Sequence, residues 1–340
     1  MKKHIRFLAI LALFLLAIPS LFAANPRLTI IATTFPIYDW TRQILGKQAE
    51  QVALIQLQNS GVDLHNFQPT VREIAQIGKC DLFLYVGGES DEWVEKALRT
   101  SNTPRRIALP LMKELGNALR EEKPLEGMEE HHHAEHDHKH HAKEHAHKHH
   151  DKEHEEDEHE NDEHIWLSLR CAATLCKAIT ARLSQLDPAH SAEYQENCRQ
   201  YTEKLQALDK EYAKAVSAAP LKTILFADRF PFRYMADDYG LTCFAAFSGC
   251  SSESEASFKT IAFLAGKVDE LKLPAVLVLE SRTHKIAETV LRTAKRKGVR
   301  ILTMDSLQSA TSRDAAKGKT YLGAMEKNLE VLKKALSSTN

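Results

Sequence analysis

Apolar residues along this chain fall into short continuous runs, separated by longer stretches of helical periodicity. The runs are rich in β-branched and aromatic residues and show little alternation with polar positions, which is typical of parallel strands covered on both faces. We therefore expect parallel sheets buried between layers of helices. The predicted strands cover residues 28–34, 52–58, 81–86 and 106–109 in the first half, and 223–227, 241–247, 275–280 and 299–304 in the second.

The stretches between these runs place apolar residues at helical spacing and predict helices that alternate with the strands. Such alternation favours an α/β fold with two βαβ-type lobes, each built on a central parallel sheet. We place the lobes at residues 24–187 and 218–340. The clearest predicted helices cover residues 38–45, 70–78, 92–99, 257–271 and 285–297.

The segment between the lobes, residues 188–217, has the composition of one long helix. Pro188 follows Asp187 at its start, and neither Gly nor a further Pro occurs before Val216. About thirty helical residues extend roughly 45 Å, the length of a domain. We expect a rigid helix joining the lobes, although the pattern also fits an ordinary amphipathic packing helix, and both interpretations can hold together. The apolar or aromatic positions are Tyr194, Cys198, Tyr201, Leu205, Leu208, Tyr212 and Val216.

The first residues have the pattern of a secretory signal. Three basic residues within 1–6 precede an apolar stretch over 7–18, and the small residues Ala23 and Ala24 follow. We expect a signal peptide at 1–23, with an uncleaved anchor as the alternative. Because the first cysteine is Cys80, a lipid anchor near the cleavage site is not expected. No later run is long and apolar enough to span a membrane, so we expect an exported periplasmic protein.

A segment over residues 129–163 contains 13 histidines, 14 acidic residues and 4 lysines. It cannot bury apolar surface, so we expect a mobile loop, at about 121–163, within the first lobe. Imidazole is a preferred zinc ligand, and tracts of this composition indicate metal binding. A purification tag is the trivial alternative, but the tract is internal and interleaved with acids. The expected weak metal sites are His131, His132, His133, His136, His138, His140 and His141.

Charge and cysteine content exclude further classes of function and of metal ligand. The net charge of −1 conceals an acidic segment over 129–163 and a mildly basic remainder, which lacks the clustered basic surface of a nucleic-acid-binding protein. Cys243 and Cys250 are the best candidate disulfide pair, whereas Cys171 and Cys176 lie on different faces of a helix. Because no CxxC spacing occurs, we expect sulfur not to be a metal ligand. We also expect a monomer.

Candidate ligands follow the predicted strands, where parallel α/β sheets bind their ligands. His65 follows strand 52–58, Asp228 follows strand 223–227, and Glu280 and His284 lie at the end of strand 275–280. His164 stands where the His-rich segment rejoins ordinary sequence. A lone histidine at such a place is usually structural. Several at strand ends, in a chain with a His-rich segment, predict a metal site in the cleft between the lobes.

Four motifs resemble those of the zinc- and manganese-binding components of bacterial ABC importers, and the similarity extends over nearly the whole mature chain. A segment rich in His and acids, placed directly before the second ligand motif, is a mark of the zinc-specific branch of that family. The motifs are Thr-Thr-Phe-Pro-Ile-Tyr-Asp at 33–39, Leu-His-Asn-Phe-Gln-Pro at 64–69, Asp-Glu-His-Ile-Trp-Leu at 162–167 and Tyr-Leu-Gly-Ala-Met-Glu-Lys-Asn-Leu at 321–329.

The resemblance implies that His65 and His164 are two ligands from the first lobe. It also implies two ligands from the second lobe, and there the sequence departs from the family pattern. The family's third ligand falls on Arg229, whose guanidinium has no lone pair to donate. From this lobe we expect His284, which lies in the region of the family's fourth ligand, and, more speculatively, Asp228 beside Arg229. Glu280 is the alternative to Asp228, and we expect Arg229 to neutralise Glu280.

Three imidazoles favour zinc over manganese, which prefers oxygen ligands, although copper and nickel also suit such a set. The resemblance implies a periplasmic protein that captures Zn²⁺ as transported cargo and delivers it to an ABC transporter permease and, through it, to the ATPase. We expect no enzymatic activity. Two alternatives stay open: an exported zinc hydrolase, for which no HExxH or GxSxG motif is present, and a zinc-buffering or adhesin protein without a transporter.

Overall fold

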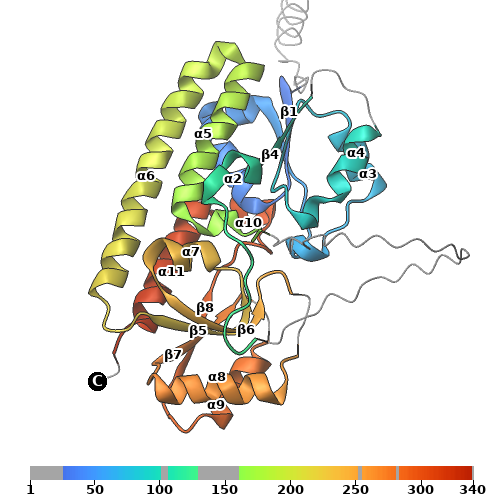
Figure 1. Ribbon diagram of the computed structural model, residues 1–340. Coiled ribbons are helices and arrows are strands. Elements are labelled where there is room, and N and C mark those ends of the chain that lie inside the picture. Colours follow the sequence, from blue (N-terminus) through green and yellow to red (C-terminus); the bar gives the residue numbers. More distant parts are fainter. Residues whose placement is uncertain (1–25, 101–105, 129–160, 252–254, 281–282, 339–340) are drawn as a thin grey trace, which may run out of the picture.

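The computed structural model shows two lobes, each with a central parallel sheet, and a pair of long antiparallel helices along one side (Figure 1). The predicted α/β class with two lobes and a long helix is thus confirmed. The expected signal peptide at 1–23 and the seven histidines proposed as weak metal sites lie outside the described residues. The structure describes residues 26–100, 106–128, 161–251, 255–280 and 283–338.

The N-terminal lobe holds a parallel sheet with strand order β2-β1-β3-β4. Its first strand is two residues shorter than predicted, because Thr33 and Thr34 turn the chain into the first helix, which begins at Phe35. The strands are β1 (Leu28–Ala32), β2 (Val52–Gln56), β3 (Leu82–Tyr85) and β4 (Ile107–Pro110), and the helices are α2 (Phe35–Leu45), α3 (Val71–Ile77), α4 (Trp93–Arg99), α5 (Leu169–Leu186) and α6 (Ser191–Ala218).

The C-terminal lobe repeats this plan with strand order β6-β5-β7-β8, again parallel. Strand β5 continues three residues beyond the predicted end at Ala227, and its pairing with β6 shifts register between Phe226 and Arg229. The strands are β5 (Thr223–Phe230), β6 (Thr242–Ser248), β7 (Ala275–Leu279) and β8 (Arg300–Met304), and the helices are α7 (Arg233–Tyr239), α8 (Phe258–Glu270), α9 (Lys285–Thr293), α10 (Ser312–Ala316) and α11 (Tyr321–Ala335).

Successive residues of the central strands enter different hydrophobic clusters, as expected for strands buried on both faces. In β1, Ile30 packs into the large cluster that faces the long helices, while Ile31 packs toward α3 and α4. In β5, Phe226 joins the same large cluster, whereas Leu225 packs toward α8 and α9. One apolar cluster therefore lies behind both sheets and runs from one lobe into the other.

Helix α6 runs antiparallel to α5 and alongside both lobes (Figure 1). Its 28 residues span roughly 42 Å. The helix begins at Ser191 rather than Pro188, since residues Pro188–His190 form a 3₁₀ turn in which His190 contacts the Asp187 carboxylate at 3.0 Å. The predicted apolar positions of the helix are buried. The long connecting helix is therefore also one half of a helical hairpin.

Buried hydrogen bonds cross between the lobes. The carboxylate of Asp39 on α2 is fully buried and accepts from the backbone N–H of Tyr321 at 2.8 Å and from Arg42 at 2.6 Å. The indole of Trp166 donates to the backbone oxygen of Ser306 at 2.9 Å. Each bond satisfies polar groups inside an apolar cluster, where an unpaired group is costly. The lobes are thus fixed to each other in one orientation.

All six cysteines are free thiols. The expected disulfide between Cys243 and Cys250 is not formed because strand β6 extends between them and carries them to opposite ends of the sheet. Within the described part of the chain, no helix combines the length and the apolar character needed to cross a bilayer.

We predict that Asp39→Ala lowers the free energy of unfolding by roughly 3 kcal/mol, because the Tyr321 N–H and the Arg42 guanidinium lose a buried acceptor. Urea denaturation followed by circular dichroism measures the change. Asp237→Ala is the matched control, since it removes a half-exposed ion pair with Arg120 and should cost less than about 1 kcal/mol. Equal losses in the two variants would contradict the role of Asp39.

A second prediction concerns Asp91. Burial raises the pKa of its carboxyl group from 3.8 to about 7, although a hydrogen bond from the Gly87 N–H acts in the opposite direction. Because the folded state holds this proton more tightly than the unfolded state, its contribution to stability is complete below about pH 4 and is lost as pH rises toward 7. Asp91→Asn should therefore gain stability relative to the unmodified protein between pH 4 and 7 and keep a constant advantage above. Urea titrations at four pH values measure this difference, and a gap that does not vary with pH would refute it.

Candidate metal centre

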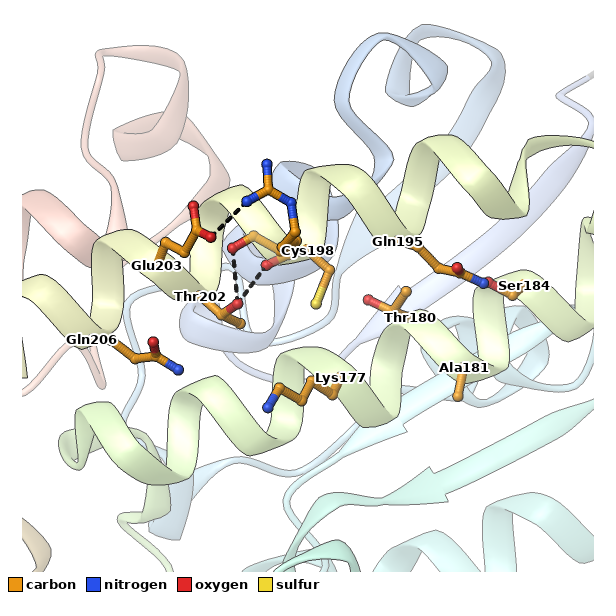
Figure 2. A pocket seen from close by; sticks show the side chains of 10 residues that line it. Lys177, Thr180, Ala181, Ser184, Gln195, Cys198, Thr202, Glu203 and Gln206 are labelled. Carbon is orange, nitrogen blue, oxygen red and sulfur yellow. Dashed lines mark hydrogen bonds and ion pairs between the residues drawn. The ribbon is translucent and has the colours of Figure 1, made fainter.

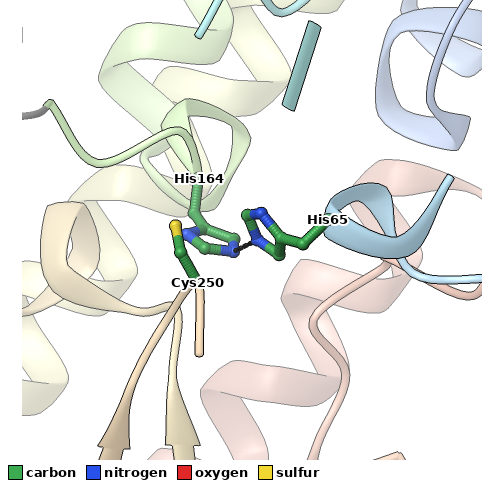
Figure 3. A group of neighbouring side chains, drawn as sticks. All are labelled: His65, His164 and Cys250. Atoms are coloured by element: carbon green, nitrogen blue, oxygen red, sulfur yellow. Dashed lines mark hydrogen bonds between the residues drawn. The ribbon is translucent and has the colours of Figure 1, made fainter. Parts of the chain in front are cut away.

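Three side chains with metal-binding atoms converge between the two lobes (Figure 3). The Nε2 atoms of His65 and His164 lie 3.2 Å apart, and the sulfur of Cys250 completes a group whose donor atoms all lie within 4.8 Å of one another. His65 follows β2, and Cys250 follows β6 in the opposite lobe. The site therefore lies at the carboxyl ends of both sheets, as predicted for parallel α/β lobes.

The ring of His65 is oriented by its neighbours. It lies in a 3₁₀ turn, Leu64–Asn66, whose first N–H groups are capped by Asp63, with the His65 N–H at 3.1 Å from the carboxylate. Its Nδ1 contacts the Ser90 hydroxyl at 2.8 Å. That hydroxyl donates its one proton to Glu163 at 2.5 Å, so Nδ1 must donate to Ser90. In the neutral ring, the lone pair is then on Nε2, which faces His164.

Glu163 holds both Ser90 and the His65 ring in place. Its carboxylate accepts from the Ser90 backbone N–H at 2.7 Å and lies 3.3 Å from Nδ1 of His65. A side chain at Gly88 would overlap the carboxylate, so the absence of a Cβ there permits the close approach. Burial is the largest influence and would raise the pKa of Glu163, but hydrogen bonds from His65 and Ser90 hold it below its ordinary value. The site thus contains a buried negative charge behind the imidazole.

His164 is fully buried and is oriented in the same way. Its Nδ1 lies 3.0 Å from the Asp162 carboxylate, which also accepts from the His164 backbone N–H at 2.8 Å. Burial alone would lower the pKa of His164, but the Asp162 carboxylate raises it above the ordinary value. Because Nδ1 donates to Asp162, the lone pair of the neutral ring points from Nε2 toward His65. Trp166 packs against the ring edge, with centroids 5.3 Å apart.

Cys250 was not expected at the site, because sulfur seemed excluded by the absence of paired cysteines. It follows β6 directly, and the same strand-end rule that identified His65 could have identified it. Its backbone N–H donates to Glu122 at 3.2 Å. A Cβ at the preceding residue, Gly249, would lie only 2.9 Å from the His164 ring, so glycine lets this turn approach the imidazole. Burial, with a smaller contribution from Glu122, raises the pKa of the Cys250 thiol.

The other predicted ligands lie outside this group of donor atoms. Asp228 is still within strand β5, where its carboxylate accepts from the Arg229 and Leu279 N–H groups at 2.8 and 3.0 Å. Glu280 accepts from the backbone and hydroxyl of Ser306, each at 2.7 Å. His284 precedes helix α9 and is half-buried. Both carboxylates therefore accept hydrogen bonds from backbone N–H groups near the strand ends.

The partner of Arg229 also differs from the expectation. Its guanidinium pairs with Asp63 in the opposite lobe at 2.7 Å, and not with Glu280. The reason is geometric, since the extension of β5 carries Arg229 across toward the loop that holds His65, while Glu280 is bound to Ser306. Asp63 therefore caps the turn that holds His65 and also forms an ion pair with Arg229 of the other lobe.

Gln308, from the loop after β8, is a further polar side chain at the site that sequence analysis missed. In the amide orientation that satisfies its hydrogen bonds, its nitrogen donates to Asp63, and its oxygen accepts from Nε2 of His164 at 2.6 Å when the His164 ring is protonated at both nitrogens. An uncharged glutamine carries no sequence signal for such a role. The imidazole pair is therefore surrounded by groups from both lobes.

A separate hollow lies between α5 and α6, with a volume of about 520 Å³ (Figure 2). Lys177, Thr180 and Gln206 are among the side chains that line it, and its one acidic residue, Glu203, is paired with Arg199 at 2.6 Å. No imidazole lies among the residues that line it. The converging donors between the lobes are therefore the better candidate for function.

Comparison with known proteins identifies relatives. Residues 30–335 match the model of the family described as "Zinc-uptake complex component A periplasmic", ZnuA. The zinc-binding lipoprotein AdcA of Streptococcus pneumoniae serotype 4 is 33% identical over 334 residues, which cover 98% of this chain and 61% of AdcA. The high-affinity zinc uptake system protein ZnuA of Bacillus subtilis is 30% identical over 310 residues, 91% of this chain and 88% of that protein. This chain thus spans less than two thirds of AdcA.

Solved structures have the same architecture. The crystal structure of Zn(II)-bound AdcA from Streptococcus pneumoniae superposes with a TM-score of 0.68 at 28% identity, covering 92% of this chain and 58% of that one. The periplasmic zinc binding protein TroA from Treponema pallidum has a TM-score of 0.70 at 21% identity, covering 92% and 99%, which supports the fold alone. With residues 30–335 matched by the family model, the resemblance noted in the motifs is confirmed: this chain belongs to the ZnuA family of zinc-uptake components.

Proposed function

We propose that this protein captures Zn²⁺ between its lobes and delivers it to the permease of an ABC importer. The observation that carries the proposal is the pair of imidazole Nε2 atoms 3.2 Å apart, on His65 and His164, each oriented by a buried carboxylate. Carboxylate-backed imidazoles are the usual arrangement around a bound zinc. Membership of a zinc-uptake family and zinc-bound relatives support zinc as the cargo.

Binding followed by release accounts for the site better than turnover does. The converging groups are ligands and the residues that orient them, and the family is one of transport components rather than enzymes. Asp228 and Glu280, whose carboxylates are bound to backbone N–H groups, are not part of the proposed ligand set, and neither is His284. The protein would act outside the cytoplasmic membrane after export, as a monomer, with the importer's ATPase reached through its permease.

The histidine- and acid-rich segment over 129–163 is proposed to collect metal ions weakly near the site, as its composition suggests. Its flanks are held together, because Glu121 and Asn161 form an antiparallel bridge and the Asp162 N–H donates to Arg120 at 2.8 Å. Asp162 orients His164, so the segment re-enters the fold directly beside a proposed ligand.

We predict that His65→Ala and His164→Ala each weaken zinc binding roughly 100-fold or more. Loss of a residue that only orients a ligand typically costs about 10- to 100-fold in affinity, and each of these variants removes a ligand itself. Competition with a chromogenic chelator measures the affinity. His190→Ala is the control, because His190 lies at the end of α5 against Asp187 and should leave affinity unchanged. Unaltered binding in both site variants would refute the proposed zinc site.

We predict that replacing residues 129–160 by a short Gly-Ser linker leaves one tight zinc site and abolishes the additional weak ones. The linker must join residue 128 to residue 161, which is bridged to Glu121, so it must be able to span the reach of the seven residues 122–128, about 25 Å when extended. Isothermal titration calorimetry with metal analysis of the dialysed protein reports both classes of site. Loss of the tight site in this deletion would show that the segment is itself part of the main site.

A further inference from the structure

We propose that the Cys250 thiolate is a ligand of the transported metal, contributed by the C-terminal lobe, and that the cargo is therefore a thiophilic divalent cation such as Zn²⁺ or Cd²⁺ and not Mn²⁺. The inference rests on the proposed function, since it names the third donor of the same site. It takes the place of the third ligand that the family pattern would have placed at Arg229. The observation that carries it is the position of the Cys250 sulfur beside two oriented imidazoles.

The spacing of the three donors fits one tetrahedral ion. With Zn–N near 2.0–2.1 Å and Zn–S near 2.3 Å, two ligand nitrogens lie about 3.3 Å apart, and nitrogen and sulfur about 3.6 Å. The two Nε2 atoms of His65 and His164 are already 3.2 Å apart, and the sulfur lies within 4.8 Å of a ring nitrogen of each histidine. A local movement of the Cys250 turn toward the two Nε2 atoms would bring the three donors to coordination distance.

The two carboxylates of the C-terminal lobe that were expected as ligands, Asp228 and Glu280, are engaged by other groups. Arg229 is cationic and paired with Asp63 across the cleft, while Asp228 accepts from two backbone N–H groups. Glu280 is bound by both groups of Ser306. Within the described part of this lobe, two side chains reach the imidazole pair: Cys250, which can ionise to a thiolate, and Gln308, which offers a neutral amide oxygen. A metal bound by both imidazoles and the Cys250 sulfur would therefore connect the two lobes.

The local backbone is built to present this sulfur. Gly249 lies so close to His164 that a Cβ there would come within 2.9 Å of the ring, and within 3.0 Å of the Phe230 carbonyl oxygen. The Cys250 N–H donates to Glu122, which is near the point where the chain leaves the N-terminal lobe. Cys243, by contrast, lies at the opposite end of β6 and contacts no imidazole in the group. It is a natural control.

A sulfur ligand changes which metals the site selects. Thiolate and imidazole together suit Zn²⁺ and softer cations, whereas Mn²⁺ prefers carboxylate and water oxygens. Binding breaks the S–H bond, forms one S–metal bond and releases the proton to solvent. With no carboxylate among the three donors, we expect Mn²⁺ to bind far more weakly than Zn²⁺.

The test uses the full-length mature chain with Co²⁺ as a spectroscopic substitute for Zn²⁺. A thiolate ligand produces an intense near-ultraviolet charge-transfer band, expected in the unmodified protein and in Cys243→Ser and absent in Cys250→Ser. Zinc affinity, measured by chelator competition, should fall roughly tenfold or more in Cys250→Ser alone. X-ray absorption of the unmodified zinc complex should show a sulfur neighbour near 2.3 Å, a result that does not depend on how any variant folds.

The outcomes separate the two proposals. Tight zinc binding that depends on His65 and His164, together with a zinc complex lacking any sulfur neighbour, overturns the role of Cys250 and leaves the proposed function standing. Zinc binding that is indifferent to the two histidines overturns the proposed function itself. Equal affinities for Mn²⁺ and Zn²⁺ would also overturn the inference, because a thiolate would then not determine the cargo.

Discussion

The structure depends on one apolar cluster that continues from the back of one sheet to the back of the other. Residues from β1, α6, β5 and α11 all belong to it, so neither lobe has a core that is complete without its neighbour. The buried bond from Tyr321 to Asp39 and the indole bond of Trp166 then fix how the two halves meet. Because close-packed interiors resist gradual deformation, the orientation of the lobes is set by packing.

That fixed orientation makes a site possible from side chains far apart in sequence. His65 and His164 belong to the N-terminal lobe and Cys250 to the other, yet their donor atoms lie within 4.8 Å. Buried acids on one side of each imidazole determine which nitrogen carries the proton. The strand ends determine where the ligand side chains lie, and the hydrogen bonds to Nδ1 determine how the imidazole rings are oriented. With the lobes held by packing, local loop movements are the natural way to admit and release an ion.

Much of this architecture could be predicted from the sequence, for identifiable reasons. Strands buried on both faces leave continuous apolar runs, and His65 and His164 stand in motifs at the ends of such elements. The group of donor atoms in the structure differs from the set expected in the second lobe, because β5 continues past Ala227 and takes Asp228 into the sheet. A strand that pairs for one or two more residues keeps its last side chains within the sheet, whereas a strand that ends earlier leaves them free to face the cleft. Cys250 was overlooked because a single cysteine carries no spacing signal.

The ion pair between Arg229 and Asp63 gives the cleft an unusual property. A guanidinium already bridges the two lobes, so the link between them does not require the cargo. Loading a divalent ion would then alter the electrostatic potential at the mouth of the cleft more than its outline. A receptor that had to tell full carriers from empty ones would have to sense charge or the motion of a few loops, since the overall shape would be nearly the same in both.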